Sequence, residues 1–130
     1  MAGVTSVDLD FGDGKYTFHL DIPRLKELQE KTGSGPPEVL SRLAEGRARI
    51  DDVRESIRLG LIGGGAAPLA AKALVERYVD ERPLIEGIAY ATLILGAAII
   101  GNKPPEADPG NQSAAGSTPP PAAPPEATDA

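Results

Sequence analysis

Few side chains in this sequence could do chemistry, and the most suggestive of them lie near the N-terminus. His19 is the only histidine. It follows three carboxylates spaced like the start of a calcium-binding loop: Asp8, Asp10 and Asp13. Such a loop would need a glycine where Asp13 stands and a glutamate where His19 stands, so the match fails. One imidazole and one carboxylate are too few for a metal site or a catalytic centre. We expect His19 and Asp8 to form a surface pair across two strands.

Three consecutive glycines at positions 63 to 65 are a second candidate, because glycine-rich loops can bind phosphate through backbone N–H groups. A P-loop would follow a strand and continue into Gly-Lys-Ser or Gly-Lys-Thr. This run instead follows a helical pattern and precedes Ala66-Ala67-Pro68. We therefore predict that the glycines end a helix, since glycine adopts positive φ freely and has no side chain to continue the helix.

Two pairs of adjacent acids, at positions 51–52 and 80–81, suggest general acid–base catalysis. No apolar cleft with a second convergent group can be argued from the sequence beside either pair. We interpret the first pair as capping carboxylates, with Asp51 or Asp52 as the N-cap of a helix, and the second as a solvated helix end. We expect no catalytic, cofactor-binding or metal-binding residues, and no enzyme.

Charge and composition argue against other classes of protein. The net charge is −6, and the basic residues are interleaved with the acidic ones. Nucleic-acid binding needs clustered Lys and Arg, so we expect no nucleic-acid partner. The absence of cysteine excludes disulfides and thiolate chemistry. No basic segment followed by an apolar run begins the chain, so we expect no secretory signal and a cytoplasmic location.

The elements that must position these residues begin with a hairpin. Residues 7–11 and 16–20 both alternate apolar and polar side chains, and Gly12-Asp13-Gly14 lies between them. A two-residue turn at Asp13-Gly14 would put all the apolar side chains on one face. It would pair Phe11 with Tyr16, Leu9 with Phe18 and Val7 with Leu20.

Helical patterns and cap signals follow the hairpin, with Pro23, Pro36, Pro68 and Pro83 each near a helix start. The predicted helices are 21–33, 34–46, 50–65, 68–82 and 84–100. The last one is apolar most of the way round, so it should be buried in the core or in a groove shared with a partner. It is somewhat short for the about 20 apolar residues of a membrane span, which leaves a membrane span as the weaker alternative.

The fold class is therefore α+β, mainly α, with an N-terminal β-hairpin followed by about five short helices. We expect one small domain over residues 1–101. Residues 102–130 are rich in Pro and Ala and lack any large apolar residue, so we predict a disordered tail.

Three segments carry a resemblance to a known family: DLDFGDGKYTFHLDI, LKELQEKTG and LSRLAEGRARIDDVRESIRLGLIGGG. They resemble the gene-transfer-agent and phage tail-assembly family, whose members are labelled as tail tube proteins or tail assembly chaperones. The resemblance covers roughly residues 4 to 100 in the same order. Its most specific parts are the hairpin, Glu-Lys-Thr-Gly at 30–33, Leu-Ala-Glu-Gly at 43–46 and the glycine block at 60–65. None of these is catalytic, so no active-site residue carries over.

The resemblance implies a tail assembly chaperone of a phage-like particle, either a gene transfer agent or a prophage. Its partners would be the tape-measure protein and the tail tube protein, bound in the cytoplasm of a bacterial host, and its oligomeric state stays open. Helix-in-groove packing would use apolar anchors, which we place at Ile57, Ile85, Ile88 and Leu93. One alternative is a virion-associated subunit of the tail tube whose hairpins pair edge to edge. The other is a small membrane-associated regulator anchored by residues 84–100.

Overall fold

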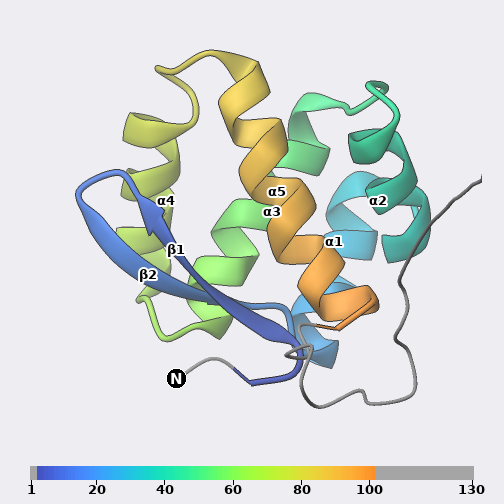
Figure 1. Cartoon of the computed structure of the whole chain (residues 1–130), viewed down its shortest axis with the longest axis horizontal. Coiled ribbons are helices and arrows are strands. Elements are labelled where there is room, and N and C mark those ends of the chain that lie inside the picture. The colour runs from blue at the N-terminus through green and yellow to red at the C-terminus, as the bar shows by residue number, and fades with distance from the viewer. Residues whose placement is uncertain (1–2, 102–130) are drawn as a thin grey trace, which may run out of the picture.

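A β-hairpin and five helices form the described part of the chain, residues 3–101 of a computed structural model (Figure 1). This arrangement confirms the predicted fold class. The tail predicted for residues 102–130 lies outside the described residues. In chain order the elements are β1 (Ser6–Phe11), β2 (Gly14–His19), α1 (Ile22–Thr32), α2 (Pro36–Ala44), α3 (Ile50–Gly63), α4 (Pro68–Tyr78) and α5 (Leu84–Ile99).

The hairpin has the predicted apolar face but a different register. Its antiparallel strands pair Val7 with Phe18, Leu9 with Tyr16 and Phe11 with Gly14. The predicted register is wrong by two residues, which leaves every side chain on its expected face because strands have a period of two. His19 lies opposite Ser6, and Asp8 lies opposite Thr17, so the expected pair of His19 and Asp8 does not form.

The position of the turn explains the shift in register. Phe11 pairs with Gly14, so Gly12 and Asp13 are the central turn residues instead of Asp13 and Gly14. Gly12 has φ of +62°, the left-handed conformation that tight hairpin turns require. A Cβ on Gly12 would also overlap the ring of Tyr78 from α4. The tertiary contact and the turn chemistry therefore favour the same position.

The caps of α1 are the predicted ones, whereas the N-cap of α3 is not. Asp21 is the N-cap of α1 and accepts a hydrogen bond from the Arg24 N–H at 3.1 Å, and Gly33 ends the helix with φ of +72°. The N-cap of α3, in contrast, is Arg49, so the predicted cap at Asp51 or Asp52 is wrong. Asp52 instead accepts the Arg49 N–H from within the first turn, at 2.9 Å.

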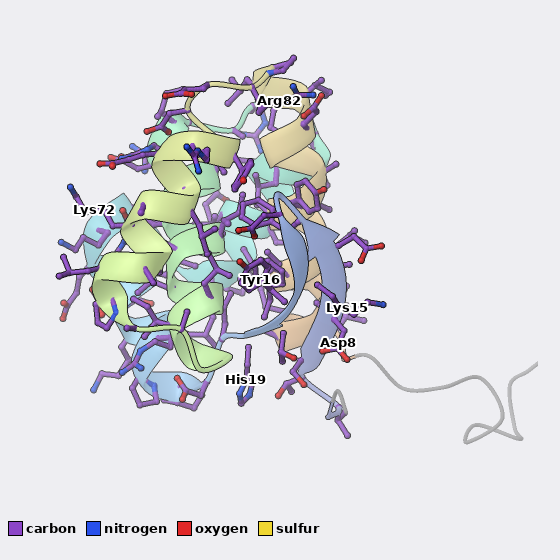
Figure 2. All side chains as sticks on the ribbon, turned by 90° about the vertical axis from the view of Figure 1, so that its left-hand side faces the viewer. Asp8, Lys15, Tyr16, His19, Lys72 and Arg82 are labelled. Atoms are coloured by element: carbon purple, nitrogen blue, oxygen red, sulfur yellow. The ribbon has the colours of Figure 1, made fainter. Side chains whose placement is uncertain are left out.

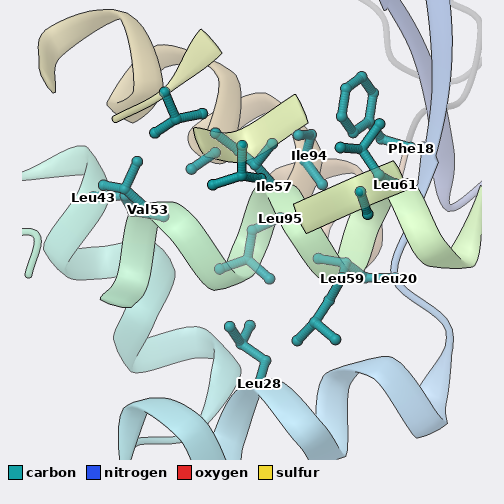
Figure 3. Close-up of a cluster of buried hydrophobic side chains, with 14 of the residues drawn as sticks. Phe18, Leu20, Leu28, Leu43, Val53, Ile57, Leu59, Leu61, Ile94 and Leu95 are labelled. Atoms are coloured by element: carbon teal, nitrogen blue, oxygen red, sulfur yellow. The ribbon is translucent and has the colours of Figure 1, made fainter. Parts of the chain in front are cut away.

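α3 is the central helix, in contact with β2 and all four other helices (Figure 1). It runs parallel to α5, because Val53 approaches Gly87 near the start of both helices and Gly60 approaches Ile94 further along. α4 connects these two helices. Side chains from the hairpin and from α1, α2, α4 and α5 pack around α3 to form one core, part of which is shown in Figure 3. The largest fully buried side chains include Phe11, Phe18, Leu28, Ile57, Leu61, Ile94 and Leu95.

Candidate protein-binding face

The four predicted anchor residues separate into core and surface. Ile57 is 0% exposed and belongs to the core, which corrects its placement on a binding surface. Ile88 is half-buried and packs against the core. Ile85 and Leu93 are 68% and 54% exposed, although both are large apolar residues. Of the four side chains, these two alone are well placed to contact a partner.

The exposed side of α5 forms a continuous uncharged surface, which we call the α5 stripe. It consists of Ile85, Ala89, Leu93, Gly96 and, just after the helix, Ile100. These residues recur every three or four positions, so they lie on one side of the helix. Sequence reasoning missed Ala89, Gly96 and Ile100. Their spacing was a visible signal, but α5 is apolar on nearly every side, and only the packing of its neighbours decides which side faces solvent.

Helices contact backbone groups at both edges of the hairpin. On the outer edge of β2, the carbonyl oxygens of Thr17 and His19 lie against the backbone of Gly64 and Gly63 at the end of α3. On the other side α5 contacts β1, and the Tyr90 hydroxyl donates a hydrogen bond to the Asp10 carbonyl oxygen at 2.9 Å. Edge-to-edge pairing with another strand would have to displace α3 from β2, or break the Tyr90 hydrogen bond on β1.

An open cleft of about 490 Å³ lies where the hairpin turn meets the end of α4 and the start of α5. The rings of Tyr78 and Tyr90 pack edge-on against Phe11 beneath it, with ring centroids 5.9 and 5.1 Å away. Arg82 and Glu86 form an ion pair at 3.1 Å beside these rings. The cleft contains cations and carboxylates in equal number but no histidine, serine or cysteine, so it lacks a nucleophile activated by a base.

The carboxylates and the histidine near the N-terminus, considered above for a metal or catalytic site, are dispersed over the hairpin (Figure 2). His19 Nε2 lies 3.1 Å from the Thr5 hydroxyl. Asp8 accepts a hydrogen bond from the Thr17 hydroxyl at 2.7 Å, and Asp13 accepts one from the Tyr16 hydroxyl at 2.6 Å. The bond to Asp13 raises the pKa of Tyr16. Within residues 3–101 no three potential ligands come together as a metal site.

One ionic cluster, around a buried carboxylate, joins α2, α3 and the loop between α1 and α2. Arg42 of α2 donates hydrogen bonds to both carboxylate oxygens of Asp52, each at 2.8 Å, and a third to the Ser34 hydroxyl at 3.0 Å. Asp52 is 0% exposed. Burial by itself would raise the pKa of Asp52, but the hydrogen bonds from Arg42 and the Arg49 N–H outweigh it and hold this pKa below its ordinary value. The cluster fixes α2 against the start of α3 and leaves no group free for catalysis.

Comparison with known families decides what kind of protein this is. The family model described as "Phage tail tube protein, GTA-gp10" matches residues 5–101, which include the hairpin and all five helices. The chain belongs to this family. The resemblance to gene-transfer-agent and phage tail proteins is thereby confirmed. No curated protein and no solved structure matches the chain.

For this tail tube family member, the remaining question is which surfaces meet its tail partners. None of the helices within residues 3–101 has the length and apolar character needed to cross a membrane. The apolar character of α5 therefore needs another explanation. Its inner side lies in the core, and its outer side, the α5 stripe, is the largest run of exposed apolar residues on one element.

Proposed function

We propose that this protein is a structural subunit of the tail tube of a phage-like particle. The observation that carries the proposal is the family match, which covers every helix and strand of the described residues under the description of a tail tube protein. Such a subunit acts by contact with its neighbours and needs no catalytic site. The α5 stripe supports this role because it offers a contact surface that does not disturb the core. The location would then be virion-associated.

A second candidate is the assembly chaperone, which would hold the tape-measure protein in the cytoplasm while the tube forms. Two observations favour it. Residues 3–101 contain one two-stranded sheet, in which the edge of β2 lies against α3 and the Asp10 carbonyl on β1 already accepts a hydrogen bond from Tyr90, so the hairpin offers little open edge for a ring of subunits. The outer side of α5 has the apolar spacing that suits packing against another helix.

The number of copies per particle distinguishes the two candidates. We would purify tail particles and count this protein against the major tail protein by quantitative mass spectrometry, beside the lysate of the producing cells. A tube subunit should be present in many copies per particle. Abundance in the lysate together with near absence from finished particles would overturn the structural role and assign the chaperone role instead.

A further inference from the structure

A groove crosses the end of α4 beside the hairpin turn, and neither the core nor the α5 stripe uses it. It consists of the open cleft of about 490 Å³ described above and a second open hollow of about 320 Å³. Arg77, Tyr78 and Glu81 line both hollows, so the two adjoin at these side chains. We call the two hollows together the Tyr78 groove. Its open, elongated form suits an extended segment of chain that lies across Tyr78.

The aromatic rings of the groove are held in a fixed orientation. Tyr78 and Tyr90 are half-buried, and both pack edge-on against the buried ring of Phe11, with ring planes at 73° and 88° to it. Gly12 lets the hairpin turn approach the Tyr78 ring, which a Cβ there would overlap. The Tyr78 hydroxyl has no hydrogen-bond partner within residues 3–101, so it is available as a donor. Rigid tyrosine rings offer contact area at a low cost in conformational entropy.

The groove also contains one cation that no carboxylate in residues 3–101 pairs with. Arg77 is exposed and forms neither an ion pair nor a hydrogen bond within this range. The second cation, Arg82, already pairs with Glu86 at 3.1 Å. Glu81 lines both hollows and offsets part of the charge of Arg77. Stacking on the tyrosine rings must therefore supply most of the binding energy, while Arg77 favours an acidic residue beside the stacked ones.

One segment of this same chain, outside the described residues, has the matching chemistry. Pro121 and Pro124 are the only two prolines of the sequence that are three positions apart. Three residues make one turn of a polyproline II helix, so both rings lie on one side of such a helix. Aromatic-lined grooves bind this pattern because proline pre-orders the chain, and proline carbonyls accept hydrogen bonds without a competing N–H. Glu126 follows two positions later, as a partner for Arg77.

The length of chain between α5 and this segment suits binding within one molecule. The groove lies at the start of α5, where Glu86 and Tyr90 line it, and the chain leaves α5 at the opposite end. The helix has 16 residues, so the two ends are about 24 Å apart. Residues 102–120 connect α5 to Pro121. Linkers of that length typically span roughly 24 Å root-mean-square, and such a match of span and distance gives the highest effective concentration.

We propose that the Tyr78 groove binds residues 121–126 of the same chain in the polyproline II conformation. Pro121 and Pro124 enter the two hollows beside the ring of Tyr78, and Glu126 pairs with Arg77. The bound segment then covers the junction of the hairpin turn with α4 and α5 and closes this surface to other proteins. The inference is independent of the proposed function, because it concerns a single chain and needs no tail partner.

The test measures paramagnetic broadening of amide signals by nuclear magnetic resonance on the full chain. The sequence has no cysteine, so Ala127→Cys gives a single attachment point for a nitroxide spin label beside the segment. We expect the amide signals of Gly12, Tyr78 and Glu81 to lose most of their intensity. The signal of Lys31 should keep its intensity, because α1 packs mainly against α2 and α3. Intact signals at the groove, or equal loss at Lys31, would overturn the proposal.

A mixed sample separates binding within one chain from binding between chains. It contains isotope-labelled wild-type chain together with spin-labelled chain that carries no isotope. Intact groove signals in this mixture are expected for binding within one chain. Their loss would mean that the segment binds the groove of a neighbouring copy, and would overturn the proposal as stated.

Variants of the spin-labelled chain test the two prolines. Pro121→Gly combined with Pro124→Gly removes both rings and keeps the chain length, so the groove signals should recover most of their intensity. Asn111→Gly combined with Gln112→Gly is the matched control, because it adds two glycines nearer to α5 and leaves the prolines in place. The loss of signal should persist in this control. Equal behaviour of the two double variants would overturn the assignment of Pro121 and Pro124.

A second comparison tests the charge. Arg77→Glu reverses the unpaired cation of the groove and should restore part of the lost intensity. Lys72→Glu makes the same change of charge at an exposed position of α4 that lines neither hollow, so the loss should persist. Circular dichroism of both variants checks that the helices are intact. An equal effect of the two substitutions would overturn the pairing of Arg77 with Glu126.

Discussion

At the scale of single residues, two of the three glycines at the end of α3 are needed because the backbone of β2 lies against them, and not because of their φ angles. Of the three glycines, Gly65 alone has positive φ, at +117°, whereas Gly64 has φ of −84°, which any residue adopts. A Cβ on Gly64 would overlap the carbonyl oxygen of Thr17, and one on Gly63 would overlap that of His19. The expectation that the glycines end the helix by their freedom in φ therefore holds for Gly65 alone.

The first prediction concerns Gly64→Ala. The added methyl group collides with backbone atoms of β2, which cannot rotate away, so the hairpin must separate from α3. We expect the free energy of unfolding to fall by about 3 kcal/mol or more, as measured by urea denaturation. Gly14→Ala is the control, because a Cβ there meets nothing within 4 Å, and it should change stability by less than about 0.5 kcal/mol. Equal effects of the two substitutions would contradict this account.

The second prediction concerns Asp52, whose pKa is lower in the folded chain than its ordinary value. A lowered folded pKa adds stability above the unfolded pKa, about 3.9 for Asp, and this stability is lost as pH falls through the folded pKa. The free energy of unfolding should therefore decrease as the pH drops below about 4. In Asp52→Asn the free energy of unfolding should decrease less over the same pH range. The substitution should also lower stability at pH 7 by about 3 kcal/mol, because Arg42 would lose its charged partner.

Asp51→Asn is the matched control for this measurement. Asp51 is the adjacent residue, but its side chain is exposed, whereas that of Asp52 is buried. Urea denaturation at several pH values from about 2.5 to about 7 gives a stability profile for the wild type and for each variant. A profile of Asp52→Asn that parallels both the wild type and Asp51→Asn would show that Asp52 does not carry the pH dependence.

At the scale of elements, the contact between α3 and α5 depends on reciprocal glycines. Val53 of α3 lies against Gly87 of α5, and Ile94 of α5 lies against Gly60 of α3. Each small residue accepts a large side chain from the other helix, so the two parallel helices approach closely. Gly96 lies on the outer side of α5 and takes no part in this contact.

The third prediction compares two substitutions on the same helix. Gly87→Ala would place its Cβ 2.8 Å from Val53 Cγ1 and 3.3 Å from Val79 Cγ1, and valine side chains have little freedom to move. We expect a net loss of about 1–2 kcal/mol in the free energy of unfolding. Gly96→Ala meets no neighbour within residues 3–101 and should gain about 0.5–1 kcal/mol in stability through helix propensity. Urea denaturation of both variants should give opposite signs, and a common sign would refute the distinction between the two glycines.

At the scale of the whole molecule, one core joins every element of residues 3–101. The hairpin contributes Phe11 and Phe18 to the same buried cluster as the helices, and α3 contacts both halves of the chain. The three tyrosines are all close to Phe11: the rings of Tyr16, Tyr78 and Tyr90 lie 6.3, 5.9 and 5.1 Å from its ring centroid. Tyrosine fluorescence therefore reports on the junction of the hairpin with α4 and α5, and far-ultraviolet circular dichroism reports mainly on the helices.

The fourth prediction follows from this single core. Thermal or urea unfolding followed by the two signals should give coincident transitions with one midpoint, because the hairpin cannot detach without exposing the cluster around Phe11. No tryptophan is present to obscure the tyrosine signal. An earlier transition by fluorescence than by circular dichroism would mean that the hairpin is a separate unit, and would contradict the description of one core.

Local sequence chemistry was enough to predict the elements and the fold class. Alternation with period two identified both strands, and Asp21 and Gly33 marked the true ends of α1, since a capping side chain and a left-handed glycine act on backbone groups a few residues away. The apolar character of α5 was equally visible. Because the sequence has no catalytic motif, it favoured a function in protein binding. The resemblance identified the family that the comparison then confirmed.

Tertiary contacts decided the position of the hairpin turn, the burial of Asp52 and the side of α5 that faces solvent. Tyr78 packs on Gly12, so the position of the hairpin turn depends on a residue far away in the sequence. Arg42 of α2 binds Asp52, so this carboxylate is buried against another helix and is not a solvated cap. Periodicity finds the apolar sides of a helix, but it does not say which side a neighbour will cover. For this reason Ile57 was placed on the surface although it is buried, and the α5 stripe emerged only once α2, α3 and β1 had covered the other sides of α5.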